Sequence, residues 1–190
     1  MAPRPDQNSA PMHSLTSRSF VALLLLFTCL SFAGARTSVD GKVKFPADEP
    51  TFTVEFPADW TYEADKDGNL DCNPGGDSEY TMSILILKDV KTDKDLKALV
   101  PKLADSMASG AKIKNFEVGD VESSTNGNGI RFTGIRGDGK TEGTDFVVLV
   151  HAFEAKKGKF YAIVTAGSEK ADTKHEKEYD AITASIESLQ

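Results

Sequence analysis

The segment DFVVLVHAF, residues 145–153, is apolar on both faces of an extended chain. Neighbouring side chains of a strand point in opposite directions. The two sets here are Phe146, Val148 and Val150 on one face, and Val147, Leu149 and Phe153 on the other. FYAIVTAG, residues 160–167, and the second half of EYTMSILILKD, residues 79–89, have the same character. Strands that are apolar on both faces lie inside a sheet that is covered above and below, usually by helices.

Two segments have the spacing of helices that cover a sheet. The first runs from about residue 93 to 107, and its apolar stripe is Leu96, Leu99, Val100, Leu103 and Met107. Because Pro101 lacks a backbone N–H, this helix is either kinked near Lys97 or begins close to Pro101. In the second segment, Thr173 and Glu176 form a capping-box pattern that predicts the helix start. Its stripe is Tyr179, Ile182, Ile186 and Leu189.

Turn signals separate the remaining strands. TFTVEFPADW, residues 51–60, alternates apolar and polar residues as far as Pro57. Further strands are predicted in KIKNFEVGDVES, residues 112–123, and in GIRFTGIRG, residues 129–137. Turns are predicted at Gly127 and Gly129, at Asp138-Gly139, and at Ala155 to Gly158. The order strand, strand, helix, four strands, helix predicts an α+β fold, in which an antiparallel β-sheet carries helices on both faces.

The N-terminal region has the pattern of a secretory signal peptide. Residues 20–32 are nearly all apolar, follow Arg18, and end at Ala33-Gly34-Ala35. This run is shorter than the ~20 apolar residues that a membrane-spanning helix needs. We therefore predict a signal peptide over residues 1–35 that is cleaved near Ala35, with an uncleaved anchor as the alternative. The mature protein is then extracytoplasmic, either periplasmic or secreted.

Cys29 and Met12 bear on the nature of this leader. Lipid attachment requires small residues just before the cysteine, whereas Phe27 and Thr28 precede Cys29, so lipid anchoring at Cys29 is not expected. A start at Met12 gives a leader of more ordinary length than a start at Met1. After the leader we predict a polar linker over residues 36–50 and one domain over residues 51–190.

The mature chain is acidic and contains one cysteine. The full chain has a net charge of −7, which becomes −8 when Arg4, Asp6 and Arg18 leave with the signal peptide. Nucleic acids and anionic membranes bind positively charged surfaces, so neither is an expected partner. Cys72 has no partner for an internal disulfide. Because no histidine or basic residue lies close to it in sequence, we predict an unreactive thiol in the loop DCNPGGD.

The segment DKDGNLD has some features of a calcium loop. Four oxygen-bearing side chains alternate along it: Asp65, Asp67, Asn69 and Asp71. An EF-hand requires glycine at its sixth position and an acid at its twelfth, which here are Leu70 and Gly76. We therefore predict a structural hairpin and no metal site.

The histidines and the tryptophan are the other candidates. His151 stands alone in its strand segment without other residues at metal-ligand spacing, so we expect a core histidine with a hydrogen-bond partner and not an acid/base catalyst. His175 falls in the first turn of the second predicted helix, where we expect solvent exposure. Trp60, together with Tyr62 and Tyr80, is suited to bind a sugar or peptide, but we predict that Trp60 is a packing anchor.

The stretch NGNGIRFTGIRGDG is rich in glycine. Each glycine cluster leads into a strand pattern and not into a helix N-terminus, so the stretch predicts turns and not a phosphate-binding loop. No catalytic, cofactor-binding or metal-binding residue is predicted anywhere in the chain, and no cofactor is expected.

Parts of the sequence resemble PsbP-like domains. VEFPADWTYE, residues 54–63, is similar to the opening of the family, in which a strand runs into Phe/Tyr-Pro, two residues and a Trp. The ending, residues 158–189, is similar to the family's close: a hairpin, an apolar strand, a polar link, and a helix that finishes in Ile-x-x-Ser-Leu/Phe. LKALVPKLADSM, residues 96–107, falls where the family has a helix. The resemblance spans most of residues 51–189.

This resemblance implies an α/β/α sandwich, which is shared by the photosystem II extrinsic subunit, small bacterial exported proteins and a Ran-binding nuclear import factor. Characterised members are accessory or binding proteins, so the resemblance implies an exported non-catalytic accessory or binding module with a protein partner. No residue that binds manganese-cluster cofactors, chloride or Ran in the family can be matched here. A small-ligand or lipid carrier and a small extracytoplasmic hydrolase or redox enzyme are the alternatives.

Overall fold

The computed structural model describes residues 41–189. The predicted signal peptide, with Met12, Cys29 and Ala35, lies outside the described residues. In chain order the elements are β1 (Lys42–Phe45), β2 (Phe52–Glu55), β3 (Thr61–Ala64), β4 (Leu70–Asn73), β5 (Tyr80–Leu87), α1 (Asp93–Gly110), β6 (Lys114–Val118), β7 (Glu122–Thr125), β8 (Arg131–Thr141), β9 (Thr144–Lys156), β10 (Lys159–Ser168), α2 (Glu169–Ser185) and β11 (Glu187–Ser188).

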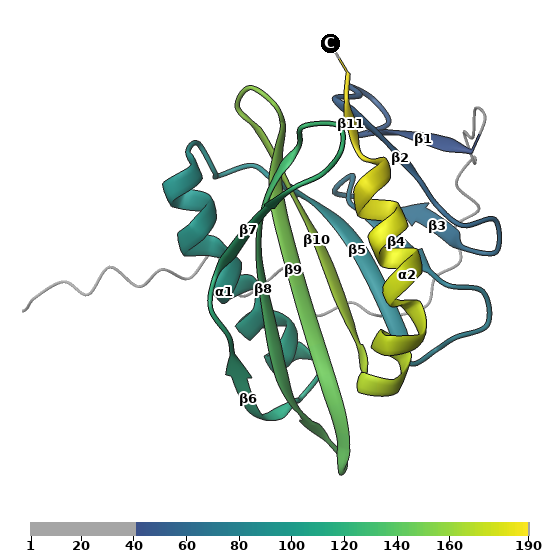
Figure 1. Ribbon diagram of the computed structural model, residues 1–190, viewed down its shortest axis with the longest axis vertical. Helices are drawn as coiled ribbons and strands as arrows, with labels where there is room; N and C mark the ends of the chain where they lie inside the picture. Colours follow the sequence, from purple (N-terminus) through teal and green to yellow (C-terminus); the bar gives the residue numbers. More distant parts are fainter. Residues whose placement is uncertain (1–40, 190) are drawn as a thin grey trace, which may run out of the picture. The chain divides into compact units, whose positions relative to one another are not determined.

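The strands form two sheets, and every pairing is antiparallel. The larger sheet has the order β3-β4-β5-β10-β9-β8-β6, with β7 also paired to β8, and the smaller sheet has the order β1-β2-β11. Helices α1 and α2 lie on opposite sides of the larger sheet (Figure 1). The predicted fold class, α+β with helices on both faces of an antiparallel sheet, is confirmed.

The long central strands bury side chains on both faces, as their sequences predict. On the face covered by α1, Val148 and Val164 pack with Val100 of the helix. On the face covered by α2 and the smaller sheet, Phe153 and Ile163 belong to the same core as Ile182. Burial of these apolar surfaces is the main force that holds the layers together.

The predicted linker contains a strand, so the prediction is wrong for residues 42–45. These residues form β1, which pairs with β2 from Lys42↔Glu55 to Phe45↔Phe52. Val43 and Phe45 alternate with two exposed lysines and are buried in the core. The alternation covers only four residues, which is too short to predict a strand by itself, and the pairing with β2 completes it.

The predicted hairpin turn at Asp138-Gly139 is wrong. Both residues lie within β8, opposite Val147 and Phe146 of β9. The turn falls instead at Glu142-Gly143, where both residues have positive φ values of 52° and 90°. That conformation suits a two-residue hairpin between twisted strands. A Cβ on Gly139 would lie 3.0 Å from the Lys114 carbonyl oxygen, so this glycine permits the close approach of β6.

Helix α1 begins where its apolar stripe predicts, at about residue 93, whereas helix α2 begins earlier than its predicted cap. Helix α1 is continuous from Asp93, with Thr92 as its N-cap and Pro101 inside it, so a start close to Pro101 is wrong. Helix α2 begins at Glu169, because the Ser168 hydroxyl accepts a hydrogen bond from the N–H of Ala171 at 3.2 Å. The predicted cap, Thr173, lies within α2. Across residues 41–189, neither helix has the length and apolar character needed to cross a membrane.

Candidate functional site

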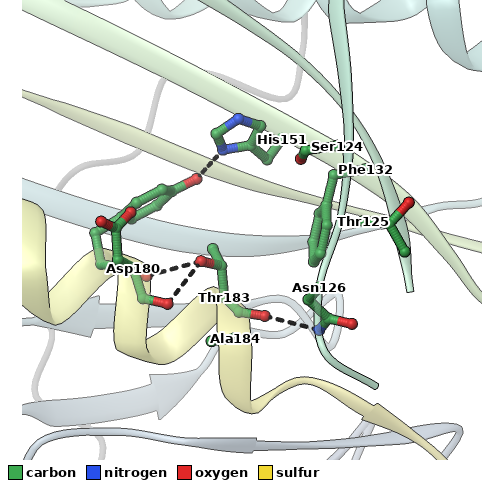
Figure 2. Close-up of a pocket in the computed structure, with 9 residues that line it drawn as sticks. Ser124, Thr125, Asn126, Phe132, His151, Asp180, Thr183 and Ala184 are labelled. Carbon is green, nitrogen blue, oxygen red and sulfur yellow. Dashed lines mark hydrogen bonds between the residues drawn. The ribbon is translucent and has the colours of Figure 1, made fainter. Parts of the chain in front are cut away.

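A surface pocket of about 280 Å³ lies between α2 and strands β7, β8 and β9 (Figure 2). Its lining residues are Ser124, Thr125, Asn126, Phe132, His151, Tyr179, Asp180, Thr183 and Ala184. The sheet places several of them on one face, since Ser124 lies opposite Phe132 in the β7–β8 register and His151 lies opposite Gly134 in the β8–β9 register. Tyr179 and Thr183 are one helical turn apart on α2, so both reach the same space.

Gly134 makes room for the histidine of the pocket. A Cβ at this position would lie 2.5 Å from Nε2 of His151 and even closer to Cδ2. The imidazole ring therefore rests on the backbone of β8, at a point where any side chain would displace it. Gly134 sets the position of His151 in the pocket.

His151 is hydrogen-bonded to Tyr179, so the predicted hydrogen-bond partner is present, but the side chain is half-buried at the pocket and does not belong to the core. The bond joins Nδ1 of His151 to the Tyr179 hydroxyl. Burial lowers the pKa of His151, against the opposing effect of the Asp180 and Glu122 carboxylates. Burial also raises the pKa of Tyr179 well above its ordinary value. Both groups are therefore neutral near pH 7.

The hydrogen bond to Tyr179 uses one ring nitrogen of His151 and leaves the other, Nε2, without a partner in the described chain. Among residues 41–189, Nδ1 of His151 is the one hydrogen-bond partner of the Tyr179 hydroxyl. A neutral imidazole carries one N–H, so Nε2 is a donor when the hydroxyl donates to Nδ1 and an acceptor when Nδ1 donates to the hydroxyl. His151 thus presents an unpaired ring nitrogen on the side of the ring away from Tyr179.

Other polar groups of the pocket form hydrogen bonds within the fold. The Asn126 side-chain amide donates to the carbonyls of Thr183 and Ile186 at 3.0 and 2.9 Å, and its oxygen accepts from the N–H of Ile130 at 2.9 Å. The Thr183 hydroxyl donates to the Tyr179 carbonyl at 3.1 Å. These bonds tie the β7–β8 turn to the end of α2, and Figure 2 shows the link between Asn126 and Thr183.

Three groups at the pocket remain available to a ligand. Within the described part of the chain, Nε2 of His151, the Ser124 hydroxyl and the Asp180 carboxylate form no hydrogen bond or ion pair with another residue. They offer an imidazole nitrogen, a hydroxyl and a negative charge. This combination is suited to recognise a polar or cationic group.

His175 lies elsewhere, and the prediction that it is exposed is wrong. Its side chain is 6% exposed, with Nδ1 2.7 Å from Glu178 and Nε2 3.0 Å from Asp77. Two hydrogen bonds hold the pKa of Asp77 well below its usual range, and the one from Lys174 has a larger effect than the one from His175. Because α2 begins at Glu169, His175 lies in the second turn and faces the core. The contact between His175 and Asp77 joins the β4–β5 loop to α2.

The aspartate-rich segment is a hairpin between β3 and β4, as predicted. Both carboxylate oxygens of Asp65 are occupied by hydrogen bonds, from the N–H of Asp67 at 2.8 Å and from the backbone and side chain of Asn69 at 2.9 and 3.0 Å. Asp71 accepts from the Ser83 hydroxyl at 2.7 Å. Over residues 41–189, no group of three or more His, Cys, Asp or Glu side chains is arranged to hold a metal ion.

Trp60 and Cys72 are buried. The indole N–H of Trp60 donates to Glu178 at 3.0 Å, and its ring packs edge-on against Tyr80, which confirms Trp60 as a packing anchor. Tyr62 is stacked on Phe56 at a centroid distance of 5.2 Å. Cys72 lies in β4 and not in a loop, and burial raises the pKa of its thiol, which disfavours the reactive thiolate.

The glycine-rich stretch has two different roles. Gly127 and Gly129 lie in the turn between β7 and β8, as predicted. Gly134, Gly137 and Gly139 lie within β8, where they admit neighbouring side chains or backbone and form no turn.

Comparisons with known proteins find similarity in structure. No family model matches the sequence, and no curated protein matches it either. The cyanobacterial PsbP protein CyanoP from Synechocystis sp. PCC 6803 has a TM-score of 0.57 and 11% identity, over 83% of this chain and 99% of CyanoP. LpqN, involved in cell envelope biogenesis of Mycobacterium tuberculosis, has a TM-score of 0.51 and 13% identity, over 78% of this chain and 91% of LpqN.

A eukaryotic protein has the same architecture. The Ran-binding protein Mog1p of Saccharomyces cerevisiae has a TM-score of 0.51 and 9% identity, over 76% of this chain and 94% of Mog1p. Together with the layers described above, these similarities define a sandwich of one antiparallel sheet between helices. The chain has the PsbP-like fold, which confirms the resemblance seen in its sequence.

Proposed function

We propose that this chain is an extracytoplasmic accessory module that binds a partner protein at the pocket between β7 and α2. The proposal rests on one observation: some polar groups of the pocket hold the fold together, whereas others have no hydrogen-bond partner. Asn126 and Thr183 are committed to the fold, whereas His151, Ser124 and Asp180 keep unused hydrogen-bonding capacity. His151 is half-buried, whereas Ser124 and Asp180 are exposed, so all three groups are accessible from solvent. Polar groups that converge on a preformed pocket in this way favour a ligand role.

Two further facts support this proposal. The predicted leader over residues 1–35 favours export, and LpqN, a protein of similar fold, is involved in cell envelope biogenesis. Mog1p, which also has this fold, is a Ran-binding protein and so binds another protein. The role of this chain is proposed from its own pocket, because fold alone does not determine function.

Photocrosslinking in cells tests this function. A photoreactive residue placed at Ser124 is expected to capture a discrete protein, whereas the same residue at Lys102, exposed on α1 on the opposite face, is not. Gly134→Ala should reduce capture severalfold, because the added methyl group displaces His151. Gly127→Ala is the matched control, since a Cβ there meets nothing within 4 Å.

Three results would overturn the proposal. They are equal capture from both positions, capture that is insensitive to Gly134→Ala, and a purified chain that carries a small organic molecule in native mass spectrometry and captures no protein. The last result would establish the carrier alternative. Turnover in a hydrolase panel that is lost in Gly134→Ala would instead establish the enzyme alternative.

A further inference from the structure

The outer edge of β7 is open. β7 pairs with β8, and no strand within residues 41–189 pairs with its other edge. The N–H of Asn126 donates to the Ile130 carbonyl at 3.0 Å, so residue 126 faces β8. Hydrogen-bonding direction alternates along an antiparallel strand. The N–H and C=O groups of Ser123 and Thr125 therefore point away from β8, where they form a row that another chain can pair with.

Exposed apolar side chains lie next to this edge. Val118 and Val121 are 40% and 39% exposed, and they are the exposed large hydrophobic residues of the described chain. Val118 ends β6, and Val121 directly precedes β7. A segment docked along β7 would cover apolar surface at this end and reach the pocket at the other end, where Ser124 and Thr125 line it.

The surroundings of the pocket are acidic. Asp180 and Glu122 lie close enough to His151 for their charges to favour its protonated form. Arg131, which is opposite Thr125 in the register, is directed toward Asp93 at 3.8 Å. The Asp180 carboxylate thus faces the pocket without a positive partner among residues 41–189, and a cationic side chain from outside would complement it.

We propose that an extended, basic segment of a partner protein adds to β7 as a further strand and places a Lys or Arg side chain beside Asp180. The inference rests on the proposed function and specifies the chemistry of the partner. Main-chain hydrogen bonds to Ser123 and Thr125 supply affinity for any extended segment. The Asp180 carboxylate supplies the preference for a basic residue.

Selection from a library of short random peptides displayed on phage, with the full chain as target, tests this inference. Selected peptides are expected to carry Lys or Arg within a run of strand-forming residues. Ser123→Pro should weaken their binding at least about tenfold, because it removes an outward N–H and keeps the ladder to β8 intact. Ser123→Ala is the matched control. Asp180→Asn should weaken binding roughly two- to fivefold, and less so at high salt.

A second measurement does not depend on any variant. In the wild-type chain with a selected peptide, nuclear Overhauser contacts should join the peptide backbone to Ser123 and Thr125. Selected peptides that bind without these contacts, or that bind Ser123→Pro normally, would overturn strand addition and leave the proposed protein-binding function standing. Selection of acidic or neutral peptides would overturn the charge preference. If no peptide is selected and Ser124 captures no protein in cells, both proposals fail.

Discussion

Replacement of Phe52 with alanine is expected to lower the free energy of unfolding by about 3–5 kcal/mol, because it leaves a large cavity in the core. The Phe52 side chain has no solvent exposure. Its ring contacts those of Phe153 and Tyr161 at centroid distances of 5.3 and 4.9 Å, so it joins the smaller sheet to β9 and β10. Chemical denaturation followed by circular dichroism measures the loss.

Phe56→Ala is the matched control for this prediction. Phe56 follows β2 directly, is only half-buried, and stacks on Tyr62 at the surface of the core. Its loss should cost clearly less than the loss of Phe52. Equal effects, or a small effect of Phe52→Ala, would mean that the segment from β1 to β2 does not pack on the larger sheet.

Replacement of His175 with alanine is expected to destabilise the chain by about 2–3 kcal/mol, since it removes a buried ring together with both of its hydrogen bonds. The imidazole contacts carboxylates on the β4–β5 loop and on α2, and it packs on Tyr80 at a centroid distance of 5.0 Å. Thermal and denaturant unfolding of the variant measure the effect.

Lys174→Ala is the matched control, because it removes the exposed ion pair with Asp77 and leaves His175 in place. Lys174 also contacts Asp77, at 2.8 Å, but its own side chain is 61% exposed. Solvent screens such a pair, so its loss should have a much smaller effect than the loss of His175. If the two variants were equally stable, His175 would have no structural role in joining α2 to the loop.

The main features of the fold could be predicted because they depend on local periodicity. The segment 145–153 is apolar at odd and even positions. The structure places Phe146, Val148 and Val150 in the core on one face of β9, and Leu149 and Phe153 in the core on the other face. Helix α1 was predicted from its apolar stripe, although Pro101 within it left the start open. Such a pattern extends over a whole helix or strand, so it predicts the element even where a single residue, such as Pro101, disfavours it.

The errors arose where a local signal competed with packing. Asp138-Gly139 has the sequence of a hairpin turn, but both residues pair with β9, and β6 packs closely over Gly139. Thr173 and Glu176 resemble a capping box, yet Ser168 caps α2 and shifts its start. With the helix beginning at Glu169, His175 faces the core. A Ser168 cap followed by Ala171, His175, Tyr179 and Ile182 as one buried stripe was the signal that could have placed this histidine.

The pocket could be predicted only in part. His151 was predicted to have a hydrogen-bond partner, and Tyr179 to belong to a helix stripe, but nothing in the sequence spacing of the two residues pairs them. The contact between Asn126 and Thr183 links residues that are 57 positions apart, and it depends on β7 and α2 lying side by side. Ser124 and Asp180 are ordinary polar residues in the sequence, and their availability becomes apparent only when the bonds around them are known.

Amide hydrogen exchange of the free protein, measured residue by residue, tests most directly the account of a sheet covered on both faces with one open edge at β7. We expect the slowest exchange in β9 and β10. Along β7 we expect protection at Glu122 and Ser124, whose N–H groups face β8, and fast exchange at Ser123 and Thr125. Fast exchange throughout β9, or equal protection of all four β7 amides, would contradict this account.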